Sequence, residues 1–351
     1  MMNTYVCRID SEDIDQELVA QAGDIIKNGG LVAFPTETVY GLGGDAFNPE
    51  SSKKIYAAKG RPSDNPLIVH IADVDKLDAL VTNISESARL LIDRFWPGPL
   101  TIIFNKSTNV PYETTGGLET VAVRMPSDEI AREFIKAAGG YVAAPSANLS
   151  GKPSPTNGRF VVQDMDGRID MILYGDDSRI GLESTIVDTT SDIPMILRPG
   201  YITKSMLEAV VGKVEVDKTI LSDNSGQAPK APGMKYRHYA PKGQLTIVAG
   251  DSEAVARYIN ENLADAKEKN LKTGVIATNQ TCTKYDADLV LSAGDGASRT
   301  EVAHRLFTML RTFDDENVDV IYSESFADDE LGTAVMNRLL KAAGHRMVSL
   351  D

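Results

Sequence analysis

The stretch that decides the fold is residues 29–71, GGLVAFPTETVYGLGGDAFNPESSKKIYAAKGRPSDNPLIVHI. The apolar run 31–34 stops at a proline and is followed by threonines, a glutamate and glycines, which predicts a buried strand leading into a polar loop. A helix is expected to start at residues 48–51. It should end at Gly60, because glycine adopts the left-handed cap and the residue before Pro62 resists helical backbone.

Two basic residues flank this predicted helix end. Lys59 and Arg61 lie two residues apart in backbone that is no longer helical, so their side chains can point to the same side. We therefore interpret them as a pair able to hold a polyanion. Lys59 also has a purely structural explanation, since a lysine in the last turn neutralises the negative end of a helix.

The composition is that of an ordinary globular protein. The 351 residues, 42% hydrophobic and 25% charged, favour two domains. The net charge of −14 disfavours broad binding to nucleic acids or anionic membranes. Cys7 and Cys282 are too far apart for a Cys-x-x-Cys motif, so no zinc site is predicted. Without a signal peptide or a run of about 18 apolar residues, a cytoplasmic location is expected.

Short apolar runs punctuated by polar loops dominate the first part of the chain. Strands are expected at 4–9, 31–34, 67–71, 100–104, 120–123, 141–144, 171–174, 185–187 and 195–197. Helices are expected at 15–27, before Gly60, and at 73–81, 85–95 and 203–211. Because so many strands occur with few helices between residues 100 and 197, we predict a twisted, mixed and open sheet with helices.

The composition changes after residue 216. Residues 217–243 show no period and end in APGMKYRHYAPKG, which indicates a linker that docks rather than a flexible spacer. Beyond it a regular pattern predicts a smaller Rossmann-like α/β domain of mainly parallel strands. Its expected strands are 245–249, 274–278, 288–291, 318–322 and 347–350, and its helices are 252–269, 299–313 and 330–343. The predicted domains are 1–213 and 244–351, joined by a linker at 214–243 that we expect to dock over the active site.

Polar side chains recur directly after predicted strands. The glycines at 41, 43 and 44 match neither common nucleotide-binding loop, so alone they carry little information. Ser146 and Asn148, in a Gly/Pro-rich loop after strand 141–144, are suitable donors to phosphate, although both are also ordinary turn formers. Arg124 and Arg198 likewise follow strands, and ligands of open α/β sheets bind where strand ends meet.

Together these motifs resemble a known family. The chain is similar to the YrdC-type domain of threonylcarbamoyl-AMP synthases, in their longer two-domain form with a C-terminal α/β domain. The motifs that carry the resemblance are FPTETVYGLG at 34–43, KGRPSDNPLIVHI at 59–71, WPGPLT at 96–101, VAVRMP at 121–126, APSANLSGKPSPT at 144–156, LRPG at 197–200 and APGMKYRHYAP at 231–241.

The resemblance implies a nucleotidyltransferase reaction and its site. L-Threonine, bicarbonate and ATP, with Mg²⁺, give threonylcarbamoyl-AMP, pyrophosphate and water, and the product passes to a tRNA threonylcarbamoyl-transferase complex for t6A modification. The phosphate tetrad corresponds to Lys59, Arg61, Ser146 and Asn148. Further ATP contacts correspond to Asn65, Thr120, Ser154, Arg198 and one of His238 and Tyr239. Threonine contacts correspond to Thr38, His70, Arg124, Ala144 and Ser184, with Arg124 pairing with the threonine carboxylate.

Two alternatives remain open at this stage. One is an RNA-binding or ribosome-associated regulatory module in which the basic residues contact a phosphate backbone, against which the net charge of −14 speaks. The other is a related adenylate-forming enzyme that uses carbamoyl phosphate or another amino acid. His70 also has a structural explanation, because a strand histidine is more often a buried core residue than a ligand contact. No metal ligand is predicted among the protein side chains.

Overall fold

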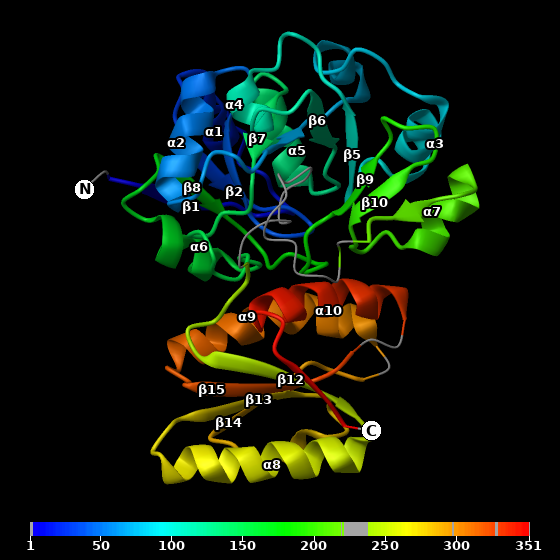
Figure 1. Ribbon diagram of the computed structural model, residues 1–351. Coiled ribbons are helices and arrows are strands. Elements are labelled where there is room, and N and C mark those ends of the chain that lie inside the picture. The colour runs from blue at the N-terminus through cyan, green and yellow to red at the C-terminus, as the bar shows by residue number, and fades with distance from the viewer. Residues whose placement is uncertain (1–2, 219, 221–237, 297, 327–328, 351) are drawn as a thin grey trace. The chain divides into compact units, whose positions relative to one another are not determined.

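The computed structural model describes residues 3–218, 220, 238–296, 298–326 and 329–350 (Figure 1). The chain divides into two compact units, residues 1–150 with 154–236 and residues 151–153 with 237–351. Each unit is an α/β structure with its own sheet. The fold class expected from the sequence is therefore confirmed, whereas the boundaries at 213 and 244 stay predictions.

In its described part, the first unit contains a mixed sheet of eleven strands in the order β1-β8-β2-β3-β7-β4-β6-β5-β9-β10-β11. Some neighbours pair in parallel, such as β4 with β6, and others antiparallel, such as β2 with β3. The strands are β1 (Tyr5–Arg8), β2 (Val32–Phe34), β3 (Gly41–Asp45), β4 (Ile68–His70), β5 (Leu100–Asn105), β6 (Thr120–Arg124), β7 (Val142–Ala144), β8 (Met171–Tyr174), β9 (Thr185–Asp188), β10 (Met195–Arg198) and β11 (Glu215–Val216).

The two largest hydrophobic cores of this unit lie on opposite faces of the sheet. Val32 and Phe34 of β2 share one core with α1 and α5, while Leu31 and Ala33 belong to the other core, with α2, α3 and α6. The alternation follows from the two-residue period of a strand. The helical segments of this unit are α1 (Gln16–Lys27), α2 (Pro49–Lys59), η1 (Val74–Ala79), α3 (Glu86–Phe95), α4 (Tyr112–Thr115), α5 (Glu129–Ala137), α6 (Gly158–Met165) and α7 (Lys204–Val211).

The predicted start and end of α2 are confirmed. Asn48 is the N-cap, and its side chain accepts a hydrogen bond from the Glu50 amide. Gly60 caps the other end with φ of 61°, in the left-handed region that favours glycine. The helix therefore ends directly after Lys59, and Arg61 lies outside it.

Two expectations for the first unit were wrong. The loop expected after β2 contains the strand β3, whereas the helical stretch expected at 73–81 is present as the 3₁₀ helix η1. The expectation of few helices between residues 100 and 197 also fails, because α4, α5 and α6 lie there. For α5 the signal was present in the sequence: Asp128 is a good N-cap, and apolar residues follow at 130, 131, 134 and 135.

Strand β3 is glycine-rich because its neighbours leave no room for side chains. A Cβ atom added at Gly41 would lie 2.8 Å from the ring of Phe34, and one at Gly43 would lie 2.7 Å from Val142. Both neighbours are completely buried. The glycines therefore mark close packing between strands, and not the loop that their turn propensity predicts.

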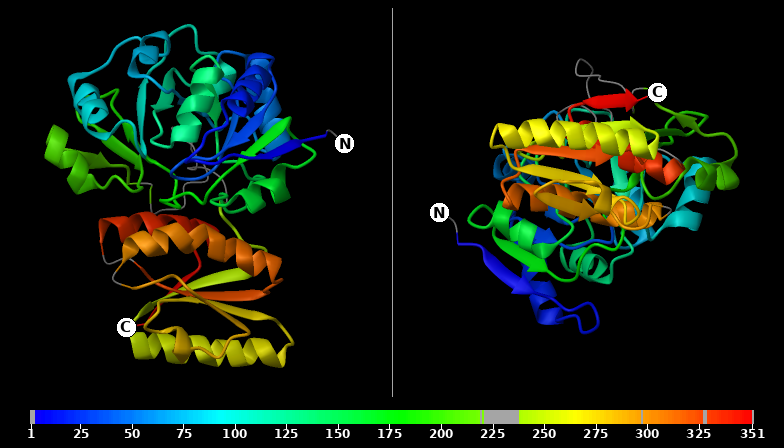
Figure 2. Two further views of the ribbon diagram at one scale, coloured as in Figure 1. Left: turned by 180° about the vertical axis from the view of Figure 1, so that it is seen from behind. Right: turned by 90° about the horizontal axis from the view of Figure 1, so that it is seen from below.

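The second unit is a parallel sheet of five strands, counted over its described residues, in the order β14-β13-β15-β12-β16. Helix α8 lies on one face of this sheet, and α9 and α10 lie on the other (Figures 1 and 2). The elements are β12 (Gln244–Gly250), α8 (Ser252–Glu268), β13 (Thr273–Ala277), η2 (Cys282–Lys284), β14 (Leu289–Ser292), α9 (Arg299–Asp315), β15 (Val320–Glu324), α10 (Glu330–Ala342) and β16 (Met347–Leu350). Among the described residues, no helix is both long and apolar enough to cross a membrane.

We expect Gly43→Ala to lower the free energy of unfolding of the first unit by about 1–3 kcal/mol, because the added methyl group overpacks a filled core. Urea unfolding followed by the fluorescence of Trp96, the single tryptophan of the chain, measures this unit. Asp93→Glu adds a methylene group at an exposed position of α3 and serves as the control. Equal stability of Gly43→Ala and wild type would show that β3 has space for side chains.

Candidate functional site

Lys59 ends α2 with its side chain buried, at 3% exposure. Its ammonium group donates hydrogen bonds to the backbone carbonyl of Ser146 and, at 2.6 Å, to that of Asn148. Ser146 Oγ in turn donates to Asn148 Oδ1 at 2.5 Å. The structure thus brings together these three members of the predicted phosphate tetrad. Because the carbonyls belong to a different loop, neutralisation of the helix end alone does not explain Lys59.

Arg61 and Asn65 lie in the loop that follows α2. The guanidinium of Arg61 donates to the backbone carbonyl of Asn65 at 3.3 Å. The side chain of Asn65 is fully buried, yet neither its oxygen nor its nitrogen has a hydrogen-bond partner within the described part of the chain. A buried amide without partners is destabilising. The Asn65 side chain therefore has the unused donors and acceptor that a polar ligand needs.

The loop of residues 36–40 lies beside the loop of residues 145–148. Gly41 and Ser146 form an isolated antiparallel bridge. The backbone amide of Ala147 donates to the carbonyl of Tyr40 at 2.8 Å. Residues predicted for threonine and residues predicted for phosphate are therefore held on adjacent backbone segments.

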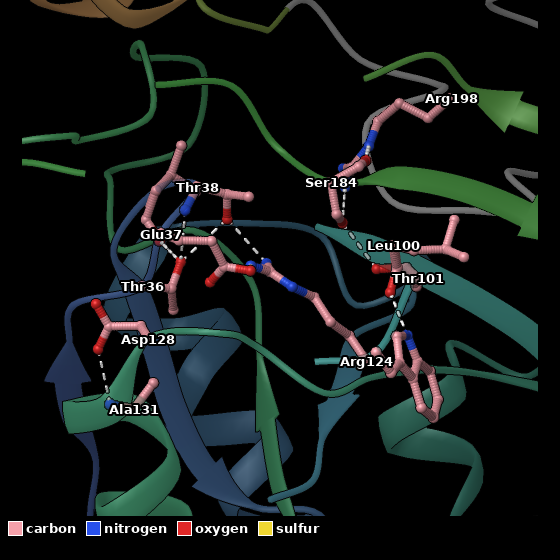
Figure 3. A network of polar contacts seen from close by, with 12 residues as sticks. Thr36, Glu37, Thr38, Leu100, Thr101, Arg124, Asp128, Ala131, Ser184 and Arg198 are labelled. Carbon is pink, nitrogen blue, oxygen red and sulfur yellow. Dashed lines mark hydrogen bonds and ion pairs between the residues drawn. The ribbon is translucent and has the colours of Figure 1, made fainter. Parts of the chain in front are cut away.

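A buried network surrounds Arg124 at the end of β6 (Figure 3). Its Nη1 donates to Thr38 Oγ1 at 2.8 Å, and its Nη2 lies 2.8 Å from Glu37 Oε1. Thr36 Oγ1 forms a hydrogen bond with Thr38 Oγ1 at 3.0 Å. The predicted pair Arg124 and Thr38 is thus in direct contact, and Glu37, which the sequence analysis did not select, is the anionic partner of Arg124.

His70 and Ala144 lie on the strands next to β6. His70 is paired with Arg124 across β4 and β6, and Ala144 ends β7 on the other side of β4. Burial, and secondarily the charge of Arg124, lowers the pKa of His70 to about 3. His70 is therefore a neutral imidazole at physiological pH, and it adds no positive charge beside Arg124.

Ser184 and Arg198 form a second buried group. Arg198 donates to the backbone carbonyl of Ser184 at 3.0 Å and to its hydroxyl at 3.1 Å. The Ser184 hydroxyl also lies 2.7 Å from Thr101 Oγ1 (Figure 3). One residue predicted for threonine thus touches one predicted for ATP, as expected if the two ligands meet there.

The remaining predicted residues are Ser154, Thr120, His238 and Tyr239. Ser154 is buried and donates to Glu183 Oε1 at 2.6 Å. Thr120 starts β6, so it lies about 13 Å along the strand from Arg124. His238 and Tyr239 belong to the second unit, where the Tyr239 ring packs 5.0 Å from that of Phe307. The preceding linker residues 221–237 lie outside the described residues.

Two buried carboxylates were missed, Glu37 and Glu183. Both stand next to predicted threonine contacts, Thr38 and Ser184. That adjacency was the available signal, but a glutamate beside a loop is exposed by default, so only the structure reveals the burial. Among the described residues, no group of three or more His, Cys, Asp and Glu is arranged to hold a metal ion.

Comparison with known proteins extends over both units. The model of a family described as Telomere recombination matches residues 24–200, and that of the Threonylcarbamoyl-AMP synthase C-terminal domain matches residues 202–344. A threonylcarbamoyl-AMP synthase of Pyrococcus abyssi is 47% identical over 339 residues, covering 97% of this chain and 98% of the relative. One from Bacillus subtilis is 48% identical over 331 residues, covering 94% of each.

A solved structure is also similar over the whole length. The crystal structure of P. abyssi Sua5 complexed with L-threonine superposes with a TM-score of 0.93 at 45% identity, covering 99% of this chain and 100% of the other. Both the sequence and the fold thus match from end to end. The chain therefore belongs to the threonylcarbamoyl-AMP synthase family.

Proposed function

We propose that this protein is an L-threonylcarbamoyladenylate synthase. It combines L-threonine, bicarbonate and ATP into threonylcarbamoyl-AMP, with release of pyrophosphate and water. The relatives that carry this name, and the similar structure that contains L-threonine, support the assignment. On this proposal the product serves t6A modification of tRNA through a separate transferase, and the protein works in the cytoplasm.

The observation that carries the proposal is the buried ammonium of Lys59 beside the loop of Ser146 and Asn148. A lysine at a helix end is normally exposed, and burying its charge is unfavourable unless it is well compensated. Backbone bonds join this loop to the loop of Thr38, whose hydroxyl contacts Arg124. Two cations are therefore bonded to neighbouring loops. Lys59, which is suited to phosphate, bonds to the loop of Ser146 and Asn148, and Arg124, which is suited to a carboxylate, bonds to the loop of Thr38.

These residues suit attack of a carbamate on the α-phosphorus of ATP. Once the threonine amine has combined with bicarbonate, a carbamate oxygen displaces pyrophosphate, and negative charge builds up on the phosphate oxygens. Fixed cations such as Lys59 and Arg61 stabilise that charge without reorganisation. Arg124 and Thr38 would hold the threonine end so that the carbamate oxygen is aligned with the leaving group. No side-chain nucleophile is needed.

ATP is proposed to enter as its magnesium complex. Mg²⁺ usually keeps several waters and binds substrate phosphates, with few protein ligands of its own. The unpartnered side chain of Asn65, in the same loop as Arg61, provides donors and an acceptor for the nucleotide. Ser154, Thr120 and Arg198 are proposed as further nucleotide contacts, and His70, Ala144 and Ser184 as further threonine contacts.

The central test is pyrophosphate release from ATP by the purified protein. We expect release only when both L-threonine and bicarbonate are present, together with an AMP adduct whose mass matches a threonylcarbamoyl group. Replacing bicarbonate by carbamoyl phosphate, or threonine by serine, should lower the rate of pyrophosphate release. Loss of the methyl group in serine should alone lower the catalytic efficiency by about 10- to 200-fold. Binding of ATP or tRNA without any turnover would contradict the proposal.

Lys59→Met keeps the apolar stem of the side chain but removes its charge. We expect it to reduce pyrophosphate release by about 100- to 1000-fold, because a fixed stabilising group of the transition state is lost. Arg61→Ala should give a similar loss. Lys53→Met, at an exposed position of the same helix, is the matched control and should keep normal turnover. Normal turnover by both site variants would remove Lys59 and Arg61 from the mechanism.

Threonine affinity should vary little between about pH 6 and pH 8. With a pKa of about 3, only about one His70 in 1000 is protonated at pH 6, so lowering the pH adds no charge beside Arg124. A histidine with an ordinary pKa would gain a positive charge over this range. Calorimetric titration with L-threonine measures the affinity, and a transition centred near pH 6.5 would contradict the neutral state of His70.

A further inference from the structure

Glu37 is a buried carboxylate to which the proposed reaction gives no role. Its side chain is 1% exposed and the side chain of Arg124 is 5% exposed, so the pair is shielded from water. Thr38 follows Glu37 directly and contacts the same guanidinium. Glu37 therefore stands inside the group of residues proposed to bind threonine.

The ion pair between Glu37 and Arg124 is incomplete. Arg124 Nη2 and Glu37 Oε1 approach to 2.8 Å, but their orientation does not form an aligned hydrogen bond. Within the described part of the chain, neither oxygen of Glu37 has a hydrogen-bond partner, and neither do Nε and Nη2 of Arg124. A buried pair is favourable only when its remaining lone pairs and protons are satisfied. These atoms are therefore unsatisfied acceptors and donors side by side, which the polar groups of a ligand would satisfy.

An α-amino acid carries the complementary charges at the matching separation. The carboxylate and the ammonium group of the amino acid are close together, because both are attached to the same carbon. The guanidinium of Arg124 and the carboxylate of Glu37 are likewise close together, because they are in direct contact. Placed head to tail against the protein pair, the zwitterion completes a ring of four alternating charges. We propose that Glu37 binds the α-ammonium group of L-threonine while Arg124 binds its carboxylate, an inference that rests on the proposed function.

The surrounding charges single out Glu37 for this role. His70, the cross-strand neighbour of Arg124, is neutral. Asp128 is the other nearby carboxylate, and its pKa is raised by burial and by the charge of Glu37. Asp128 accepts a hydrogen bond from the Ala131 amide as the N-cap of α5, whereas Glu37 contacts the guanidinium itself (Figure 3).

This arrangement makes the amino group a determinant of specificity. A ligand that keeps the carboxylate and hydroxyl of threonine but lacks the amine would leave the Glu37 oxygens buried without a donor. Sites built to hydrogen-bond a polar group reject analogues that lack it, because the unpaired protein atoms are costly. (R)-3-Hydroxybutyrate is such an analogue of L-threonine.

The first experiment needs only the wild-type protein. Calorimetric titration should show L-threonine binding at least about 100-fold more tightly than (R)-3-hydroxybutyrate, since a charge-assisted contact is lost. Equal affinity for the two ligands would overturn the role of Glu37 while leaving the proposed function intact. Absence of any threonine binding would overturn both.

The second experiment compares Glu37→Gln with Asp128→Asn. Glu37→Gln should weaken L-threonine binding by about 10- to 100-fold and change (R)-3-hydroxybutyrate binding little, so that the discrimination between them collapses. Asp128→Asn removes a neighbouring charge but keeps a good N-cap, and should retain the wild-type discrimination. If Glu37→Gln weakens both ligands equally, Glu37 only positions Arg124 and the proposal is wrong. Trp96 fluorescence confirms that each variant is folded.

Discussion

The arrangement of the candidate site depends on the burial of one ammonium group, that of Lys59. Its hydrogen bonds to the Ser146 and Asn148 carbonyls join the end of α2 to the loop after β7, and the Ser150 amide returns a bond to the Lys59 carbonyl. Without that charge, carbonyl groups in the interior would lose their donor. The same residue therefore holds two loops together and provides positive charge, so stability and chemistry are not separable at this position.

Much of the fold could be predicted because local signals agree with the tertiary structure. Residues 48–60 contain an N-cap, a proline in the first turn and a glycine cap, and α2 has these bounds. Strand β3 could not be predicted, since GLGGD has the composition of a turn and is a strand only because Phe34 and Val142 fill the space above its glycines. Val142 comes from a strand far along the sequence, and a local pattern does not encode such a contact.

The residues of the candidate site also fall into those that could be predicted from the sequence and those that could not. Lys59, Ser146 and Asn148 could be selected because each follows a predicted element end and belongs to a residue type that binds anions. Glu37 was not selected, because its importance depends on burial and on the guanidinium of Arg124, which comes from a strand more than eighty residues later. Neither property is visible in the PTET segment itself. Paired charges of opposite sign also cancel in any count of net charge.

Strand β3 has a consequence for motion. Leu42 is the only large apolar side chain in GLGGD, so β3 is held by backbone hydrogen bonds and by contacts that its neighbours provide. The strand lies in the middle of the sheet, between β2 and β7, and four of its five residues are buried. Because β3 continues directly from the loop of Glu37 and Thr38, that loop is anchored at the centre of the sheet, where local opening requires about as much free energy as unfolding of the whole unit. The close backbone packing that the glycines permit therefore couples the motion of the amino-acid site to the stability of the whole unit.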